Sequence, residues 1–247
     1  MGGAPIVDSD DAIARAATEA IQSGDVDRLR RLLRERPDLA RTYIREKHPK
    51  RETFRTLLHV ATDWPGHFPN GPATVSALVE AGADVNAPVM GPHSETPLHW
   101  AASSNDVAVV DALLACGANI EAPGAVIGGG APLADAVAFG QWEAARRLVE
   151  RGASSNLWQS AALGLMDRVR MFFQGSPPPQ DELDNAFWCA CHGGKRASAE
   201  YLLERGANIN WTGHNGLTPI DAAQRSGADD LTGWLRGLGA KSAKEPG

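Results

Sequence analysis

The chain has 247 residues, and its hydrophobic share of 43% and charged share of 22% are typical of a folded soluble protein. The formal net charge of −6 argues against nucleic acid or an anionic membrane as the partner, because both require a basic patch. No apolar run is long enough for a membrane span, and Met1–Ala14 lacks the pattern of a signal peptide. Without disulfide-type spacing, Cys116, Cys189 and Cys191 predict a reducing, cytoplasmic environment.

The N-terminal part of the chain is predicted to be flexible over residues 1–10 and helical from Asp11 to Ala40. The second half of that segment is strongly charged, as expected for the solvent-facing end of a helical stack. The most basic stretch, Arg45–Arg55, is short and interrupted by Glu46 and Glu52, so we interpret it as a solvated loop.

A helix-opening motif then recurs along the chain. Thr96-Pro-Leu-His-Trp-Ala-Ala102 has a close match in Thr56–Ala61 and a variant in Thr218–Ala223. Threonine caps the helix, proline occupies the first turn without losing a backbone donor, and leucine points into a core. Each motif therefore predicts a short helix that begins at its threonine.

A second motif closes each unit. Similar segments occur at Leu78–Asn86, Leu113–Glu121 and Leu202–Asn210, with a shorter match at Leu148–Ala153. Glycine ends the second helix in the left-handed conformation, and the residues after it form a projecting turn. The glycines at 82, 117 and 152 are 35 residues apart, and a shortened copy, Leu157–Gly175, fills the longer gap before Gly206.

On these motifs the chain resembles the ankyrin-repeat family from about Asp11 to Ala240. The resemblance implies an all-α solenoid of helix-turn-helix units with projecting turns, free-standing and similar in composition to bacterial members, and a flexible tail at residues 241–247. About seven units are expected, near residues 11–40, 53–86, 94–121, 128–154, 155–175, 181–210 and 215–240.

The resemblance also implies that His59 and His99 are structural and bridge turn and helix through hydrogen bonds. Trp158 and Trp188 are expected to replace this histidine in later units. The sequence Cys189-Ala-Cys191-His192 could suggest a metal site, but residues two apart on a helix point to different sides. We therefore expect no metal and no cofactor.

Two insertions interrupt the repeats, at Asp63–Pro72 and at Ala122–Gly130. Loops tolerate insertions at low cost, so one interpretation is that these insertions are neutral surface additions without a function. The glycine run of the second insertion lacks the lysine of a phosphate-binding loop. The first insertion contains tryptophan, histidine and phenylalanine, which is unusual for decoration alone.

The predicted binding face is the concave side of the array, to which each first helix contributes one face. In the register of the spaced glycines, the residues expected there are Asp63, Trp64, Trp100, Ser103, Ser104, Asp135, Phe139, Gln159 and His192. Such an aromatic-lined surface is typical both of ligand sites and of protein interfaces.

The leading hypothesis is a binding module or adaptor that recognises a protein or peptide on this concave face and is not an enzyme. The alternative is a small-molecule or catalytic pocket in which Asp135 and His192 act as an acid–base pair. A purely architectural role in a larger assembly is a third interpretation.

Overall fold

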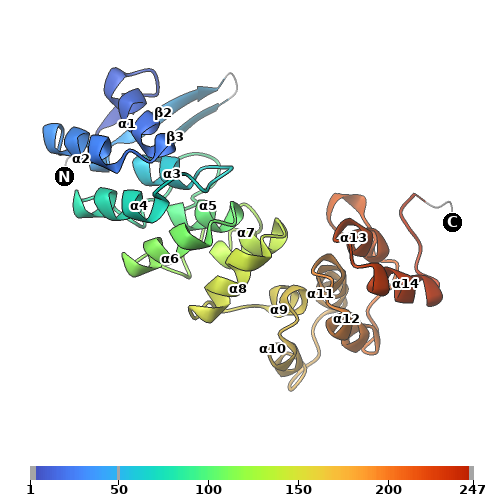
Figure 1. The fold of residues 1–247 in the computed structure, drawn as a ribbon. Coiled ribbons are helices and arrows are strands. Elements are labelled where there is room, and N and C mark those ends of the chain that lie inside the picture. The colour runs from blue at the N-terminus through green and yellow to red at the C-terminus, as the bar shows by residue number, and fades with distance from the viewer. Residues whose placement is uncertain (1–3, 49–50, 245–247) are drawn as a thin grey trace. The chain divides into compact units, whose positions relative to one another are not determined.

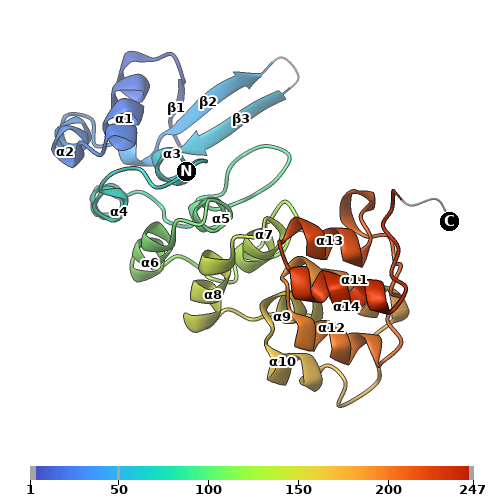
Figure 2. The same cartoon turned by 45° about the vertical axis from the view of Figure 1, so that its right-hand side comes forward.

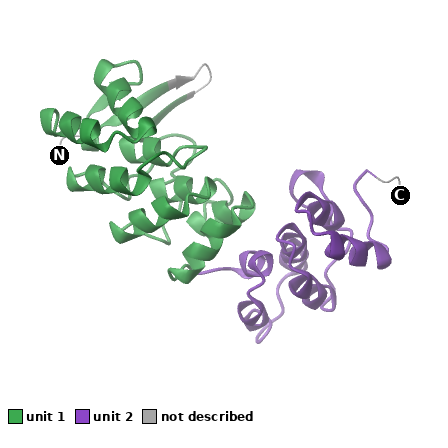
Figure 3. Ribbon diagram, in the orientation of Figure 1, with its two compact units in different colours: residues 1–153 green, residues 154–247 purple. Residues whose placement is uncertain are grey.

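A computed structural model describes residues 4–48 and 51–244 of the chain. Within these ranges the protein is mostly helical, with one small β-sheet (Figure 1). The chain divides into two compact units, residues 1–153 and 154–247, which are coloured separately in Figure 3 and are described in turn.

Unit 1 contains four pairs of helices in the described ranges. They are α1 (Ala12–Ser23) with α2 (Val26–Glu35), α3 (Leu57–Thr62) with α4 (Gly71–Glu80), α5 (Pro97–Ser103) with α6 (Val107–Ala115), and α7 (Pro132–Ala138) with α8 (Trp142–Glu150). The first helices α1, α3, α5 and α7 pack side by side in one row. The second helices α2, α4, α6 and α8 form another row against it. Unit 1 is therefore a two-layered helical stack.

Local sequence explains both ends of these helices. The Thr56 and Thr96 side chains cap α3 and α5, as the helix-opening motif predicts. Gly117 and Gly152 follow the second helices of two pairs with φ values of 89° and 102°, the left-handed conformation predicted for the closing glycines. Fully buried leucines and alanines from both rows fill the space between neighbouring pairs.

A three-stranded sheet adds to the expected helical architecture. Strands β2 (Tyr43–His48) and β3 (Arg51–Thr56) form an antiparallel hairpin, and β1 (Ile6–Asp8) pairs in parallel with β2. The interpretation of Arg45–Arg55 as a solvated loop was therefore wrong for its described residues. Its charges are paired within the sheet: Arg45 bonds Asp8 at 2.6 Å, and Arg55 pairs with Glu46.

The sheet also revises the expected N-terminal boundary. Residues 1–10 were expected to be flexible, yet residues 6–8 are a paired strand; residues 1–3 lie outside the described ranges. The hairpin in turn contacts the loop between α4 and α5, where Phe54 and Met90 exchange two backbone hydrogen bonds of 2.9 Å. Figure 2 shows this loop extending alongside the hairpin.

Unit 2 contains three further helix pairs in its described residues. They are α9 (Leu157–Leu163) with α10 (Met166–Met171), α11 (Gln180–His192) with α12 (Arg196–Leu203), and α13 (Pro219–Arg225) with α14 (Asp229–Gly237). Helix α11 packs between α9 and α13. Short 3-10 helices also occur at Leu39–Arg41 in unit 1 and at His214–Gly216 in unit 2.

The predicted tail at residues 241–247 is partly attached to unit 2. The backbone N–H of Lys241 donates to the side-chain oxygen of Asn210 at 2.8 Å, and that of Ala243 donates to Asp221 at 2.9 Å. These bonds attach the chain to unit 2 as far as Ala243, and residues 245–247 lie outside the described ranges.

Candidate functional site

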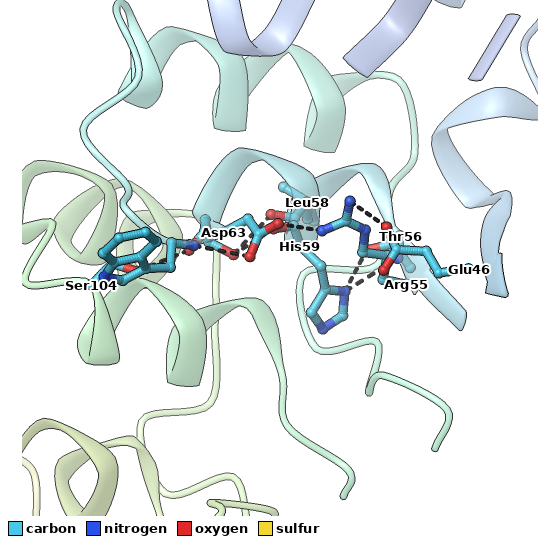
Figure 4. A network of polar contacts seen from close by, with 9 residues as sticks. Glu46, Arg55, Thr56, Leu58, His59, Asp63 and Ser104 are labelled. Atoms are coloured by element: carbon cyan, nitrogen blue, oxygen red, sulfur yellow. Dashed lines mark hydrogen bonds and ion pairs between the residues drawn. The ribbon is translucent and has the colours of Figure 1, made fainter. Parts of the chain in front are cut away.

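The hairpin and helix α3 are joined by an arginine between two carboxylates. Arg55 of β3 makes ion pairs with Glu46 of β2 and with Asp63 at the end of α3 (Figure 4). Its side chain is only 15% exposed, so both pairs are largely withdrawn from solvent. Asp63 also accepts a hydrogen bond from the backbone N–H of Trp64 at 2.9 Å. The predicted site residue Asp63 is thus already paired with Arg55.

His59 fixes the junction between α3 and α5. Its Nδ1 accepts the backbone N–H of Thr56 at 3.2 Å, and its Nε2 bonds the backbone carbonyl of Glu95 at 3.1 Å. Burial lowers the pKa of His59 to about 4, so the ring is neutral at neutral pH and Nε2 carries the proton. His99 makes the same contacts with Thr96 and with the carbonyl of Gly130. Both histidines therefore have the structural contacts that the resemblance implied.

Trp100 is held against this junction. Its ring makes an edge-to-face contact with the ring of His59, with centroids 4.9 Å apart and an interplanar angle of 74°. The indole remains partly exposed. A hydrogen bond from Trp100 acts on the Glu95 carboxylate and favours its charged form, although burial dominates and raises the Glu95 pKa overall.

A cavity of about 380 Å³ opens between the hairpin, the loop before α5 and Trp100. Its wall combines residues of the hairpin, of that loop and of the second insertion. These residues are Glu46, Thr53, Arg55, Val89, Gly91, Pro92, His93, Glu95, Trp100 and Val126. A concave site with an aromatic side chain and a few convergent charged groups is the usual form of a binding pocket.

Asp135 lies behind this wall on α7. Its side chain is 0% exposed, and neither carboxyl oxygen makes a hydrogen bond of normal geometry among the described residues, although the backbone N–H groups of Ile127 and Val126 lie close enough to act on its charge. Burial and the charge of Glu95 raise the pKa of Asp135 to about 7, while the backbone N–H groups of Ile127 and Val126 oppose that shift more weakly. A buried carboxyl without a partner is costly, and such groups concentrate at functional sites. However, Asp135 does not line the exposed surface as the sequence predicted.

Two other predicted aromatic residues are exposed. Trp64 is 78% exposed and Phe139 is 51% exposed. Trp64, Ser104 and Phe139 each follow the N-cap of α3, α5 or α7 by eight residues, and these three helices are consecutive in one row. The first insertion, which carries Trp64, is anchored where the His67 N–H donates to Asp106 at 2.7 Å.

The two predicted serines have internal partners instead. Ser104 is buried, and its hydroxyl donates to the carbonyl of Thr62 at 3.4 Å, across the contact between α5 and α3. The prediction of Ser104 as a surface contact was therefore wrong. Ser103 is half-buried and donates to the carbonyl of Trp100 in its own helix at 3.0 Å.

In unit 2, Gln159 is buried and caps the start of α9. Its side-chain oxygen accepts the N–H of Asn156 at 3.0 Å, while Asn156 accepts the N–H of Gln159 at 3.1 Å. This reciprocal cap places Gln159, not Trp158, at the position that histidine occupies in α3 and α5, because each follows its N-cap by three residues. The predicted substitution of histidine by Trp158 was wrong in register.

Trp188 makes the hydrogen bond to the next repeat unit that His59 makes in α3. Its Nε1 donates at 2.9 Å to the carbonyl of Leu217, the residue before the cap of α13. His192 lies one turn further along α11 and stacks on Trp188, with ring centroids 5.4 Å apart. His192 and Asp135 belong to different compact units, and their pairing stays a prediction.

The cysteines beside His192 belong to the core of unit 2. Cys189 and Cys191 are buried, and burial raises the pKa of Cys189 to about 12 and that of Cys191 further still. In the described ranges, no group of three or more histidine, cysteine or acidic side chains is arranged to hold a metal ion.

Of the residues that line the cavity, only Trp100 was predicted from sequence; among those missed are Glu46, Arg55, Glu95 and Val126. The first two lie in the segment interpreted as a loop. The strand-favouring residues next to its charges, Ile44 just before the segment and Phe54 within it, are the signal that favours a hairpin. Val126 belongs to the second insertion, which was noticed but not assigned to the site.

Comparison with known proteins agrees with this architecture. Residues 70–159 match a family model described as ankyrin repeats (3 copies). The chain is also similar to the crystal structure of the human ASB11 ankyrin repeat domain, with a TM-score of 0.51 and 20% sequence identity over 89% of this chain and 96% of that one. At this identity the likeness supports the fold alone.

Among the described residues, no helix combines the length and the apolar character that crossing a bilayer requires. Ankyrin repeats serve in general as protein-interaction modules. With its helix pairs, capped openings, left-handed closing glycines and matching family model, the chain is an ankyrin-repeat protein.

Proposed function

We propose that the protein is a binding module that recognises a partner protein or peptide on the row of first helices in unit 1. The observation that carries this proposal is the pair of exposed aromatic side chains, Trp64 and Phe139, which follow the C-terminal ends of α3 and α7, the two first helices that pack on either side of α5. Aromatic side chains are common anchors in protein interfaces.

The anchors are also held in place before a partner binds. Arg55 and Asp106 fix the first insertion at either side of Trp64, and His59 fixes Trp100. A preorganised surface loses less conformational entropy on binding. That this row forms a concave face remains part of this proposal.

Selection of peptides against the whole protein tests the proposal. A random peptide library is displayed on phage, and enriched peptides are synthesised and titrated into the protein by calorimetry. We expect Trp64→Ala and Phe139→Ala each to weaken binding at least about tenfold, as truncated interface anchors do.

The matched control is Phe172→Ala, which removes an exposed aromatic side chain from unit 2. Binding that is unaffected by Trp64→Ala and Phe139→Ala, or that depends equally on Phe172, would place the interface elsewhere and contradict the proposal. Failure to enrich any binding peptide would also count against it.

A further inference from the structure

The cavity beside Trp100 is lined by two carboxylates, one arginine and one histidine. Arg55 is the one arginine or lysine among the residues that line it, and its guanidinium is already paired with Glu46 and Asp63. Glu95 lines the same cavity and makes no ion pair with lysine or arginine in the described part of the chain. His93 is the other basic side chain of the wall, and it acts on Glu95. An anionic ligand would therefore meet Glu46 and Glu95 without finding an arginine or lysine that has no partner.

Asp135 adds an independent observation. It is completely buried, its oxygens make no hydrogen bond of normal geometry among the described residues, and the charge of Glu95 acts on it. Of its two nearby backbone N–H groups, that of Val126 belongs to a residue of the cavity wall. A positive charge in the cavity would favour the ionised form of Asp135, which burial and the charge of Glu95 disfavour.

The cavity also has the size and the surface for a long side chain. Its volume of about 380 Å³ exceeds what a single arginine or lysine side chain fills, and Trp100 supplies an aromatic surface beside Glu95. Cations are attracted to tryptophan rings, and the attraction is stronger where solvent is partly excluded.

We infer that this cavity receives a basic side chain, arginine or lysine, from the partner protein. The inference rests on the proposed function and specifies the chemistry of its partner. The cation contacts Glu95 and the ring of Trp100, and Asp135 attracts it through the wall without touching it. Arg55 keeps its own two partners and shapes the rim.

Titration with isolated amino-acid derivatives tests the inference without a partner protein. N-acetylarginine amide and N-acetyllysine amide are added to the ¹⁵N-labelled protein, and the Trp100 indole N–H resonance is followed by NMR. That resonance is assigned with Trp100→Phe. We expect a saturable shift with a dissociation constant of roughly millimolar order, as suits so small a ligand.

N-acetylcitrulline amide is the matched ligand control, because it has nearly the shape of the arginine derivative but no charge. Glu95→Gln is expected to weaken arginine binding about tenfold and Asp135→Asn by several-fold, while Glu35→Gln on the exposed end of α2 leaves it unchanged. Dispersed amide spectra establish that each variant is folded.

Three outcomes would overturn the inference: no saturable shift, an equal shift with the citrulline derivative, or unchanged binding in Glu95→Gln. None of them depends on peptide selection. If selected peptides bind through Trp64 and Phe139 while the arginine derivative does not bind, the proposed function stands and the basic anchor is wrong. If the arginine derivative binds but no peptide is selected, the proposed function fails and the cavity remains a cation site.

Discussion

The ring of Trp100 rests edge-to-face on the ring of His59, with their centroids 4.9 Å apart. The same histidine joins the cap of α3 to the backbone of Glu95. A residue that the repeat uses for its own stability therefore also orients two residues of the candidate binding cavity.

Replacing His99 tests how much such a histidine stabilises the stack. Since its ring is buried and bonded at both nitrogens, His99→Ala leaves polar backbone groups of Thr96 and Gly130 without partners. We expect a loss of roughly 2–4 kcal/mol in the free energy of unfolding, measured with urea. The exposed His67→Ala serves as control, and an equal loss in both variants would refute the assignment.

The burial of Asp135 predicts how the stability of the protein depends on pH. Its pKa in the folded protein is about 7, above the ordinary value of 3.8, so folding binds a proton between these values and stability declines as pH rises through that window. Asparagine cannot ionise. Asp135→Asn should therefore gain stability relative to the native protein by roughly 2 kcal/mol between about pH 5 and pH 8.

Urea unfolding at both pH values measures this gain, with the exposed Asp27→Asn as control.

The buried histidines change the pH dependence of stability in the opposite direction. Burial lowers the pKa of His59 and of His99 to about 4, so their contribution to stability is lost as pH falls from about 6.5 toward 4. Only the difference between Asp135→Asn and the native protein isolates the carboxyl, and a difference that does not change with pH would contradict its burial.

Gln159 is predicted to stabilise unit 2 through its reciprocal cap with Asn156. Gln159→Ala should lower the stability of the protein by about 1 kcal/mol, whereas Gln159→His should retain much of it, because histidine makes the same cap in α3 and α5. Thermal unfolding of both variants, with the exposed Gln224→Ala of α13 as control, makes the comparison. Equal melting temperatures for Gln159→Ala and the control would exclude the cap.

Trp188 offers a second test in the same unit. Trp188→Phe keeps most of the buried ring but removes the bond to Leu217, so we expect a loss of roughly 1–3 kcal/mol, including the cost of a carbonyl left without its donor. Trp158→Phe alters a half-buried tryptophan that makes no hydrogen bond in the described residues. Should the two variants unfold at the same denaturant concentration, the indole bond contributes nothing measurable.

The helical architecture was predictable from sequence because its signals are local. Thr96 and Gly117 each mark a helix end through their own backbone preference, and the repetition of the motifs makes the pattern specific. The cavity was only partly predictable. Trp100 could be placed from its position in the repeat, but Glu46 and Arg55 reach the site through a hairpin whose strand pairing is non-local.

The sequence also did not predict which residues of the first helices are buried. Asp135 and Ser104 occupy positions that repeat geometry places near Trp100 and Trp64, yet both are covered by neighbouring segments. Ser104 packs under the first insertion, where a side chain at Gly66 would approach it to 2.9 Å. Insertions have no counterpart in the repeat, so the register alone does not show which positions they cover.

The pairing of β1 with β2 also affects how the protein can be shortened. A chain trimmed to begin at Asp11, where the repeat motifs start, would lose the strand at residues 6–8 and the Arg45–Asp8 contact. The neighbouring hairpin would then have an open edge, and that hairpin supplies Glu46 and Arg55 to the cavity. A fragment chosen from repeat boundaries alone would keep the helices while weakening the wall that ligands are expected to meet.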